Sequence, residues 1–234
     1  MIAREGLYII LAGVILTVGL VLAASRWDSK TAFVLSLICG ILTIFTVFFF
    51  RDPNRDVSPQ PGLLMAPADG RVIAIENLAE NPYVGGPAKK VSIFLSIFDV
   101  HVNRVPASGR IDYVAYNPGK YFAAFKDKAS HLNEQTEIGM VTSQGHKIIF
   151  KQIAGLIARR IVCNLAEGDE VAVGQRFGII KFGSRAEVIV PSASDITISV
   201  GEHVTAGMSV IGYLPREISS SETKDNARGR NVEI

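Results

Sequence analysis

Two uncharged apolar stretches near the N-terminus constrain the fold of this 234-residue chain more than any other feature. They cover residues 7–24 and 32–50, and as helices they would be roughly 27–29 Å long at the usual rise per residue. That length matches the ~30 Å hydrocarbon core of a bilayer. Only the polar segment 25–31 separates them, and it places Trp27 where an interfacial aromatic residue is expected. The pattern predicts a transmembrane helical hairpin with both ends on one side of a membrane.

The alternative is a signal peptide followed by a core helix. It is disfavoured because the first apolar run is longer than the roughly 7–15 residues of a signal peptide, and no clear cleavage site follows it. Basic residues suggest the orientation of the hairpin. Its outer ends carry Arg4, Arg51 and Arg55, against Arg26 and Lys30 in the short loop. Because basic residues favour the inner side, we expect the rest of the chain on the cytoplasmic face of the cell membrane.

Composition argues against several classes of binding partner and site. The chain has 24 basic and 22 acidic residues, for a formal net charge of +2, so it offers no broad cationic surface for nucleic acid. Cys39 and Cys163 are too few and too far apart to indicate a disulfide framework or a zinc site, which fits a reducing setting. The sequence predicts no metal site, and it leaves a homo-oligomer open.

After a proline-rich linker at 50–62, short apolar runs alternate with turns. Nine runs predict strands, at 71–78, 90–97, 109–117, 146–154, 160–165, 177–182, 186–191, 196–200 and 209–214. A single soluble helix is expected near 119–130. The sequence thus predicts a transmembrane hairpin over 1–55, a mainly-β (β-rich α+β) domain over 56–216, and a polar, disordered tail over 217–234.

Residues 168–180 and 201–213 share the pattern Gly-x-x-Val-x-x-Gly followed by apolar residues. The pattern is typical of a strand that enters and leaves a tight turn. The two copies resemble the half-motifs of biotinyl/lipoyl-type barrels, which present a lysine between them. Lys181 lacks the flanking methionine of such carriers, so the group on display would be Ser184.

Gly183 and Ser184 interrupt an otherwise regular strand at 181–190, which on its own indicates a bulge or close backbone approach. Three other stretches carry residues suited to acid–base chemistry. Asp69 lies in an Asp-Gly pair that is also an ordinary turn signal. His101 lies in the apolar run 97–106, and two-residue alternation would put it on one face with Asp99 and Asn103. Segment 129–139 adds polar residues, namely His131, Asn133 and Glu134.

Five stretches in order resemble the phosphatidylserine decarboxylase proenzymes of the short, hairpin-anchored branch. They are FFFRDPNR (48–55), APADGRV (66–72), IFLSIFDVHVNRVP (93–106), KASHLNEQ (128–135) and FGSRAEV (182–188), and the resemblance covers roughly residues 45–214. It implies that the β-rich domain is catalytic. It also implies a self-cleaving enzyme that cuts between Gly183 and Ser184 into a β chain of 1–183 and an α chain of 184–234. Its cofactor would be a covalent pyruvoyl group made from Ser184.

The resemblance assigns roles. Ser184, activated by a base, would attack the Gly183 carbonyl, and the resulting ester would be eliminated to leave the pyruvoyl precursor. His101 is the expected base and Asp69 the residue that orients it. Longer relatives carry a second histidine where this chain has Arg104, so His101 could serve cleavage, decarboxylation or both. Candidate contacts to the lipid are Arg51, Arg55, Arg104, His131 and Asn133.

The pyruvoyl group would form a Schiff base with the substrate amine and accept the electrons released with CO2. The expected reaction converts phosphatidylserine in the membrane to phosphatidylethanolamine. Two alternatives remain: a serine ether-lipid substrate with the same headgroup, and a membrane-tethered, lipoyl-like binding module that never cleaves.

Overall fold

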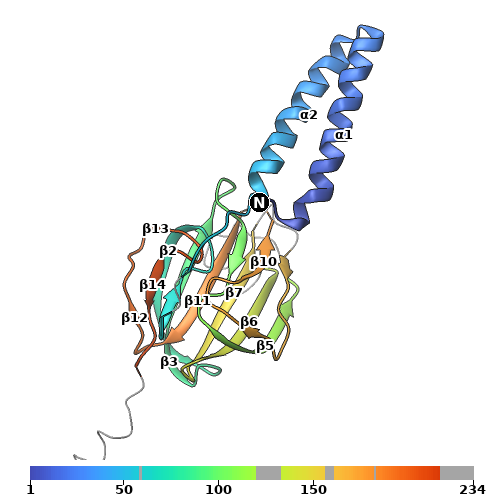
Figure 1. Cartoon of the computed structure of the whole chain (residues 1–234). Helices are drawn as coiled ribbons and strands as arrows, with labels where there is room; N and C mark the ends of the chain where they lie inside the picture. The colour runs from blue at the N-terminus through green and yellow to red at the C-terminus, as the bar shows by residue number, and fades with distance from the viewer. Residues whose placement is uncertain (58–59, 120–132, 156–160, 182, 217–234) are drawn as a thin grey trace, which may run out of the picture.

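The computed structural model describes residues 1–57, 60–119, 133–155, 161–181 and 183–216. Two helices, α1 (Arg4–Trp27) and α2 (Lys30–Phe49), project together from one end of a β-rich domain (Figure 1). Both are long and apolar enough to cross a membrane. They agree with the predicted apolar spans, and because they stand clear of the domain, α2 is not a core helix of it.

The helical hairpin is closed by a two-residue turn and by small side chains. Asp28 adopts a left-handed conformation that ends α1, and the Ser29 hydroxyl accepts a hydrogen bond from Ala32 N at 3.3 Å to begin α2. Gly13 lets the helices approach closely, since a Cβ there would lie 2.6 Å from the Thr43 hydroxyl. Such contacts between small residues are how apolar helices pack in lipid.

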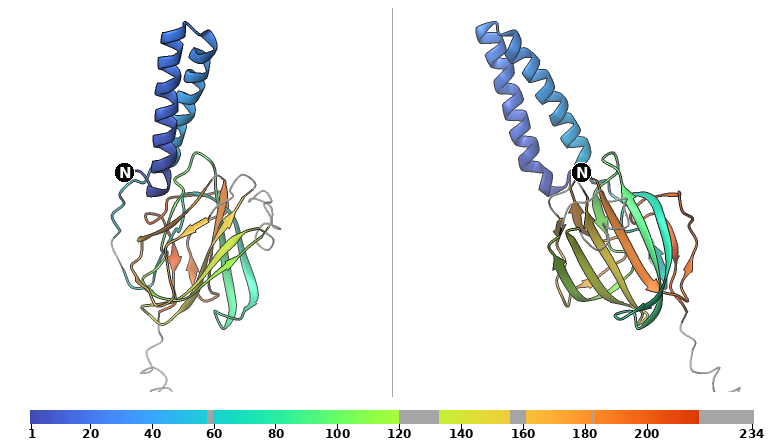
Figure 2. Two further views of the ribbon diagram at one scale, coloured as in Figure 1. Left: turned by 90° about the vertical axis from the view of Figure 1, so that its right-hand side faces the viewer. Right: turned by 180° about the vertical axis from the view of Figure 1, so that it is seen from behind.

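The two ends of the hairpin are joined to each other by backbone hydrogen bonds. Ala3 N donates to Phe50 O at 2.8 Å, and Asp52 N donates to Met1 O at 2.8 Å. The N-terminus therefore lies beside the end of α2, whereas the C-terminal end of the described chain lies at the opposite end of the domain (Figure 2).

The domain contains fourteen strands among the described residues, and Figure 1 shows how they curl around one core. They are β1 (Leu63–Met65), β2 (Gly70–Asn81), β3 (Gly86–Leu95), β4 (Val102–Arg104), β5 (Gly109–Asn117), β6 (Gln135–Thr142), β7 (Lys147–Ala154), β8 (Ile161–Cys163), β9 (Glu170–Val171), β10 (Arg176–Ile180), β11 (Ser184–Pro191), β12 (Asp195–Ile196), β13 (His203–Val204) and β14 (Val210–Tyr213). An eight-stranded sheet has the order β13-β2-β3-β11-β7-β6-β5-β9. Two three-stranded sheets have the orders β1-β14-β12 and β4-β10-β8.

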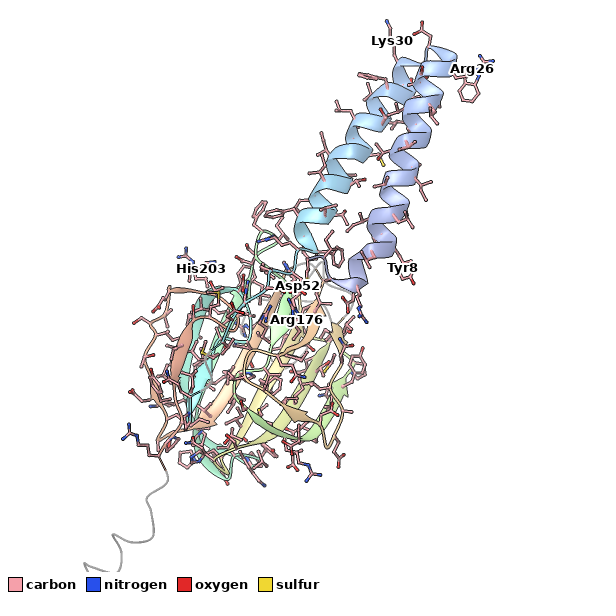
Figure 3. The ribbon with its side chains drawn as sticks, in the orientation of Figure 1. Tyr8, Arg26, Lys30, Asp52, Arg176 and His203 are labelled. Atoms are coloured by element: carbon pink, nitrogen blue, oxygen red, sulfur yellow. The ribbon has the colours of Figure 1, made fainter. Side chains whose placement is uncertain are left out.

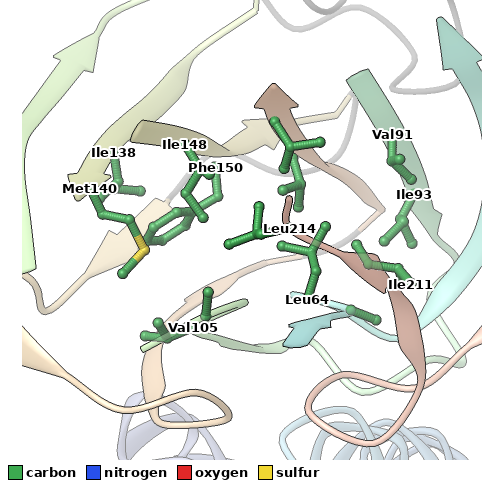
Figure 4. Close-up of a cluster of buried hydrophobic side chains, with 14 of the residues drawn as sticks. Leu64, Val91, Ile93, Val105, Ile138, Met140, Ile148, Phe150, Ile211 and Leu214 are labelled. Carbon is green, nitrogen blue, oxygen red and sulfur yellow. The ribbon is translucent and has the colours of Figure 1, made fainter. Parts of the chain in front are cut away.

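The core lies between these sheets. Val91, Ile93, Ile138 and Phe150 from the large sheet meet Leu64 and Ile211 from a small one, as labelled in Figure 4. Phe150 and Phe177 also pack edge to face, with ring centroids 5.1 Å apart. Buried and exposed positions alternate at the start of β2 and β5, whereas the central strand β11 is buried at every position except its last.

Eight of the nine predicted strands are present, whereas the run 196–200 lies in a strand only at Ile196, the end of β12. Two other predictions need correction. The run 97–106 is not one extended strand, because Ser96–Asp99 forms a turn in which the Asp99 carboxylate accepts from Ser96 N at 2.7 Å. Asp99, His101 and Asn103 therefore do not share a strand face. Strand β6 was not predicted, since its inward positions include two threonines and read as polar. The predicted helix at 119–130 and the predicted tail at 217–234 lie outside the described residues, except for Gly119.

An approximate internal twofold relates the two halves of the domain. Counted from its two edges, the large sheet has equivalent strands: β13 matches β9, β2 matches β5, β3 matches β6 and β11 matches β7. The small sheets match each other in the same way, β1-β14-β12 with β4-β10-β8. The two halves also exchange matching backbone hydrogen bonds: Met65 N donates to Pro106 O at 2.8 Å, and Arg104 N donates to Pro67 O at 2.9 Å.

The Gly-x-x-Val-x-x-Gly copies are part of this symmetry. Each contributes a short edge strand and a turn, and the equivalent glycines, Gly174 and Gly207, both have a positive φ. Gly207 N donates to Ala66 O and Gly174 N to Val105 O. The repeat found in the sequence thus marks a duplicated turn that joins each small sheet to the large one.

Candidate active site

Ser184 begins β11 in the middle of the large sheet, paired with Leu95 of β3 and Ala154 of β7. The side chain is fully buried, and within the described part of the chain its hydroxyl has no hydrogen-bond partner. A buried polar atom without a partner is costly and uncommon, and it is often found where chemistry takes place. Gly183 has a φ of +63°, a conformation that glycine adopts without strain, and a Cβ there would meet no atom within 4 Å.

His101 lies at the same end of the domain as Ser184. It immediately precedes β4, and its carbonyl accepts a 3.4 Å hydrogen bond from Ile180 N, at the end of the strand that leads to Ser184. The imidazole is fully buried and its ring centroid lies 4.1 Å from that of Phe49. The last turn of α2 therefore covers one face of the imidazole.

The hydrogen bonding of His101 fixes its tautomer. Nδ1 lies 3.0 Å from Asp99 O, and because a carbonyl oxygen can only accept, Nδ1 carries the proton. Nε2 is then left with a free lone pair, and it is buried without a partner in the described chain. The pKa of His101 is lowered to about 4, mainly by burial and also by the Arg51 charge, while the Asp99 hydrogen bond and charge and the Asp69 charge oppose the shift. A neutral imidazole at physiological pH can act as a base.

Asp69 does not contact His101. Both of its carboxylate oxygens are bound by Arg55, at 2.6 and 2.8 Å, and Ala206 N donates to one of them at 2.8 Å. The predicted Asp-to-His orientation is thus replaced in the structure by the Asp99 carbonyl and the Phe49 ring. Asp69 reaches His101 only through its charge.

The segment 51–55 forms a strap across the hairpin end of the domain. Arg176 and Arg104 approach the Asp52 carboxylate at 2.7 and 3.6 Å, and Arg104 also donates to Pro53 O and Gly174 O. Asp52 and Arg176 lie side by side at the base of the hairpin in Figure 3. The strap fixes the exit of α2 over the site.

This strap changes two predictions about lipid contacts. Arg55 and Arg104 are buried and hold protein groups, so neither guanidinium is presented to a headgroup. Arg51 is half-buried, stacks 4.0 Å above the Phe48 ring and donates to Phe98 O at 2.6 Å. It remains the arginine of the three that faces outward beside the hairpin.

The polar segment before β6 also reaches the site. Asn133 is buried and donates from Nδ2 to Ala154 O at 2.6 Å, on the residue that pairs with Ser184. The Glu134 carboxylate accepts from the Tyr116 hydroxyl at 3.1 Å. His131 lies outside the described residues. Among the described residues no cluster of three or more metal-ligating side chains is found.

Several contributors were not foreseen from the sequence. Phe49, Asp52 and Arg176 act through contacts between segments that are distant in the chain. Asp99 was singled out beside His101, but its contact through the backbone carbonyl was not foreseen. The motif FFFRDPNR carried the signal for the strap. Its arrangement over the site could be seen only in three dimensions.

The sequence model of the phosphatidylserine decarboxylase family matches residues 42–212. The chain belongs to this family. Three similar relatives are each described as a phosphatidylserine decarboxylase proenzyme. The one from Desulfotalea psychrophila is 42% identical over 91% of this chain and 96% of its own length. That from Syntrophus aciditrophicus is 46% identical over 90% and 96%, and that from Chlorobium phaeobacteroides is 51% identical over 74% and 80%. The enzyme class is therefore carboxy-lyase, and the family supports decarboxylation of phosphatidylserine.

Proposed function

We propose that this chain is a membrane-anchored phosphatidylserine decarboxylase that matures by cutting its own Gly183–Ser184 bond. The products would be a β chain of 1–183 and an α chain of 184–234 that begins with a pyruvoyl group made from Ser184. The observation that carries the proposal is the buried, unpartnered Ser184 hydroxyl directly after a glycine with positive φ. The word proenzyme in the names of the relatives supports it.

The surroundings of Ser184 fit this modification. The backbone pairing of β11 with β3 and β7 would hold residue 184 in place after the bond is cut. The positive φ of Gly183 is a backbone conformation that glycine adopts without strain next to the bond to be cut. Burial of Ser184 limits the access of bulk water, which would otherwise hydrolyse the ester before elimination takes place.

Self-cleavage proceeds from the atoms of this chain. Ser184 Oγ loses its proton to a base and attacks the Gly183 carbonyl carbon; the C–N bond breaks, the nitrogen takes up a proton, and an ester replaces the amide. Loss of the Ser184 α-proton then expels Gly183 as a carboxylate and leaves dehydroalanine. Addition of water and release of ammonia complete the pyruvoyl group. The net change consumes one water and releases one ammonia.

His101 is the base that we propose for this step. Its neutral state, its free Nε2 lone pair and its position at the Ser184 end of the domain suit proton removal. Phe49 and the Asp99 carbonyl hold the ring in one orientation. The Asp69 charge favours the imidazolium that forms, acting through space rather than by a hydrogen bond.

In the mature enzyme the pyruvoyl group supplies the electron sink for loss of CO2 from the serine headgroup. We propose that His101, at the same end of the domain as residue 184, moves a proton in that reaction as well. Arg51 is the proposed contact for the anionic headgroup, since it is the outward-facing arginine beside the hairpin. Asn133 would help to position residue 184 through Ala154.

The hairpin would place this end of the domain against the lipid. We propose that α1 and α2 span the cell membrane and that the domain lies on the cytoplasmic side, because basic residues slightly favour the outer ends of the hairpin. Protease added to sealed, right-side-out cells should then spare the domain. Digestion from outside would contradict this orientation.

Three finer predictions remain with this proposal. The duplicated turns resemble biotinyl/lipoyl half-motifs, so a barrel of that type is still a hypothesis for this part of the domain. A homo-oligomer also stays a prediction. The lipid itself could be a diacyl or an ether serine phospholipid, because the reacting headgroup is the same, and parallel assays on both lipids would separate them.

The test compares two buried serines. Ser184→Ala should give an uncleaved, inactive but folded protein. Ser194→Ala is the matched control, because the Ser194 hydroxyl is also buried without a partner in the described chain but follows Ala193 instead of a glycine. Denaturing gels measure cleavage, and a CO2-release assay on phosphatidylserine measures activity. Normal cleavage of Ser184→Ala would refute the proposal, and an uncleaved 25.3 kDa wild-type chain would favour a binding module.

A further inference from the structure

Phe98 is a large aromatic side chain that the domain leaves 64% exposed. It lies in the turn Ser96–Asp99, between the end of β3 and His101. No role in the proposed chemistry accounts for it, because the imidazole is held by the next residue, Asp99, and by Phe49. A single exposed apolar residue is ordinary on a protein surface, so its position must decide whether it has a function.

The position of Phe98 is set by the hairpin. Its carbonyl accepts a 2.6 Å hydrogen bond from Arg51, two residues after α2 ends at Phe49. The same guanidinium stacks on the Phe48 ring and donates to Phe48 O at 3.0 Å. The Phe98 turn is therefore held at the level where α2 leaves the domain. If α2 crosses a bilayer, that level is the boundary between lipid and water.

The turn is also held rigidly. Asp99 accepts from Ser96 N at 2.7 Å and from His203 Nε2 at 3.2 Å, and Phe98 N donates to the Ser96 hydroxyl at 3.3 Å. Figure 3 places His203 at the same end of the domain as Asp52 and the base of the hairpin. A fixed turn pays little conformational entropy to present an aromatic ring to a surface.

We propose that Phe98 is a second membrane contact, inserted at the boundary between headgroups and acyl chains. The occupant of this surface is the bilayer. Two observations favour lipid over another protein: the turn is continuous with the end of an apolar hairpin, and cations accompany it at this level, with Arg51 beside Phe98 and Lys181 5.8 Å from the Phe50 ring centroid. Aromatic rings flanked by basic residues are typical of membrane interfaces.

The proposal rests on the membrane anchoring proposed above and adds a consequence. A contact at Phe98 lies three residues from His101 in the sequence. The hairpin alone would let the attached domain tilt together with it in the bilayer. Two contacts fix the tilt, so that the end of the domain with Ser184 faces the headgroups. A phospholipid could then reach the site from the lipid surface without leaving it.

Tryptophan fluorescence can test this contact, because Trp27 is the only tryptophan of the chain. In a Trp27→Phe background, the full-length chain would carry one of three substitutions. Phe98→Trp probes the turn, Ile15→Trp probes the middle of α1, and Tyr213→Trp probes β14, three residues before the described chain ends away from the hairpin. Each protein is inserted in phosphatidylcholine–phosphatidylglycerol vesicles whose acyl chains carry bromine at a shallow or a deep carbon.

We expect Phe98→Trp emission to be quenched more by shallow than by deep bromines, Ile15→Trp more by deep ones, and Tyr213→Trp by neither. Quenching of Ile15→Trp without quenching of Phe98→Trp would overturn this inference and leave the anchor intact. Quenching of neither would overturn the anchor as well. Equal quenching of all three would show non-specific adsorption and would also overturn it.

Discussion

The turn at Pro67–Arg71 and the turn at Pro106–Arg110 share the sequence Pro-Ala-x-Gly-Arg and occupy equivalent places in the two halves of the β domain. Their third residues accept equivalent hydrogen bonds: Asp69 from Ala206 N at 2.8 Å, and Ser108 from Val173 N at 2.9 Å. The glycines that follow also match, since a Cβ on Gly70 or Gly109 would lie 2.1 or 2.2 Å from a carbonyl oxygen of the adjacent strand.

The two ends differ in the residues that these equivalent positions carry. The residue just before β4 at the hairpin end is His101, and its equivalent before β1, at the opposite (far) end of the domain, is Gly62. Likewise, His203 pairs with Arg71 at the hairpin end, and Glu170 pairs with Arg110 at the far end. Only Asp69 gains a second partner, Arg55, from the strap. The backbone of the turn is thus present at both ends of the domain, whereas the side chains suited to the proposed chemistry lie at the hairpin end.

The largest effect should come from replacing His101 by glycine, the residue at the equivalent position of the far end, Gly62. His101→Gly removes the proposed base, and loss of a general base costs about 10²–10⁴-fold in rate. Cleavage followed on denaturing gels should slow accordingly, while His146→Gln, at a histidine hydrogen-bonded to Pro215 O, should mature normally. A wild-type maturation rate in His101→Gly would exclude His101 from cleavage.

The Asp69 turn should be far more sensitive to truncation than the Ser108 turn. Asp69→Ala leaves the Arg55 guanidinium buried without its partner, which typically costs about 3–5 kcal/mol, whereas Ser108→Ala loses one hydrogen bond worth about 1 kcal/mol. Unfolding of the detergent-solubilised chain in urea measures both. Equal losses would mean that the ion pair does not distinguish the two turns.

A double substitution separates stability from chemistry at Asp69. Asp69→Leu with Arg55→Met replaces the buried pair by apolar side chains, which is often neutral or stabilising. If Asp69 acts mainly as a clamp, the double variant should fold and mature at a rate reduced only by the lost charge near His101. A stable double variant that never cleaves would show that the carboxylate is needed in the reaction itself.

The pH dependence of maturation tests the burial of His101. A base with a pKa of about 4 stays neutral down to mildly acidic pH, so the cleavage rate should change little between pH 8 and pH 5.5. A solvent-exposed histidine, with an ordinary pKa near 6.5, would be about 90% protonated at pH 5.5, and the rate would fall roughly tenfold. A tenfold fall would contradict the buried, neutral imidazole.

Among the substitutions, the smallest effect is expected at His203. His203→Glu introduces the residue type found at the far end, but it sets a carboxylate against that of Asp99. The repulsion should weaken the turn that holds His101 and slow maturation by a few-fold, the equivalent of about 1 kcal/mol. His203→Gln keeps a donor toward Asp99 and should mature at nearly the wild-type rate. Identical rates for the two variants would remove His203 from the support of the site.

The hairpin and eight of the strands could be predicted from the sequence because each depends on local pattern, and the contiguous motif at 182–188 singled out Gly183 and Ser184 as the proposed cleavage pair. Strand β6 was missed since Thr136 and Thr142 occupy inward positions that look polar in one dimension. The turn at Ser96–Asp99 was missed because alternation alone gives no sign of the Asp99 side chain folding back on Ser96 N.

The partners of the site residues could not be predicted in the same way. Asp69 and Arg55 are 14 positions apart, and Asp69 and Ala206 are 137 apart, so their pairing depends on how the strap and the duplicated turn meet. Phe49 closes over His101 only because the N-terminal segment and residues 50–52 fix the end of α2. Residue identity was readable from the motifs, whereas orientation required the fold.

The central claim is cleavage of the Gly183–Ser184 bond with conversion of Ser184 to a pyruvoyl group, and intact-mass analysis of the purified wild-type chain tests it most directly. The account predicts two fragments, residues 1–183 and 184–234, with the second lighter than a simple hydrolysis product by the mass of one ammonia molecule. A single chain of 25.3 kDa, or a 184–234 fragment that retains its amino-terminal serine, would contradict it.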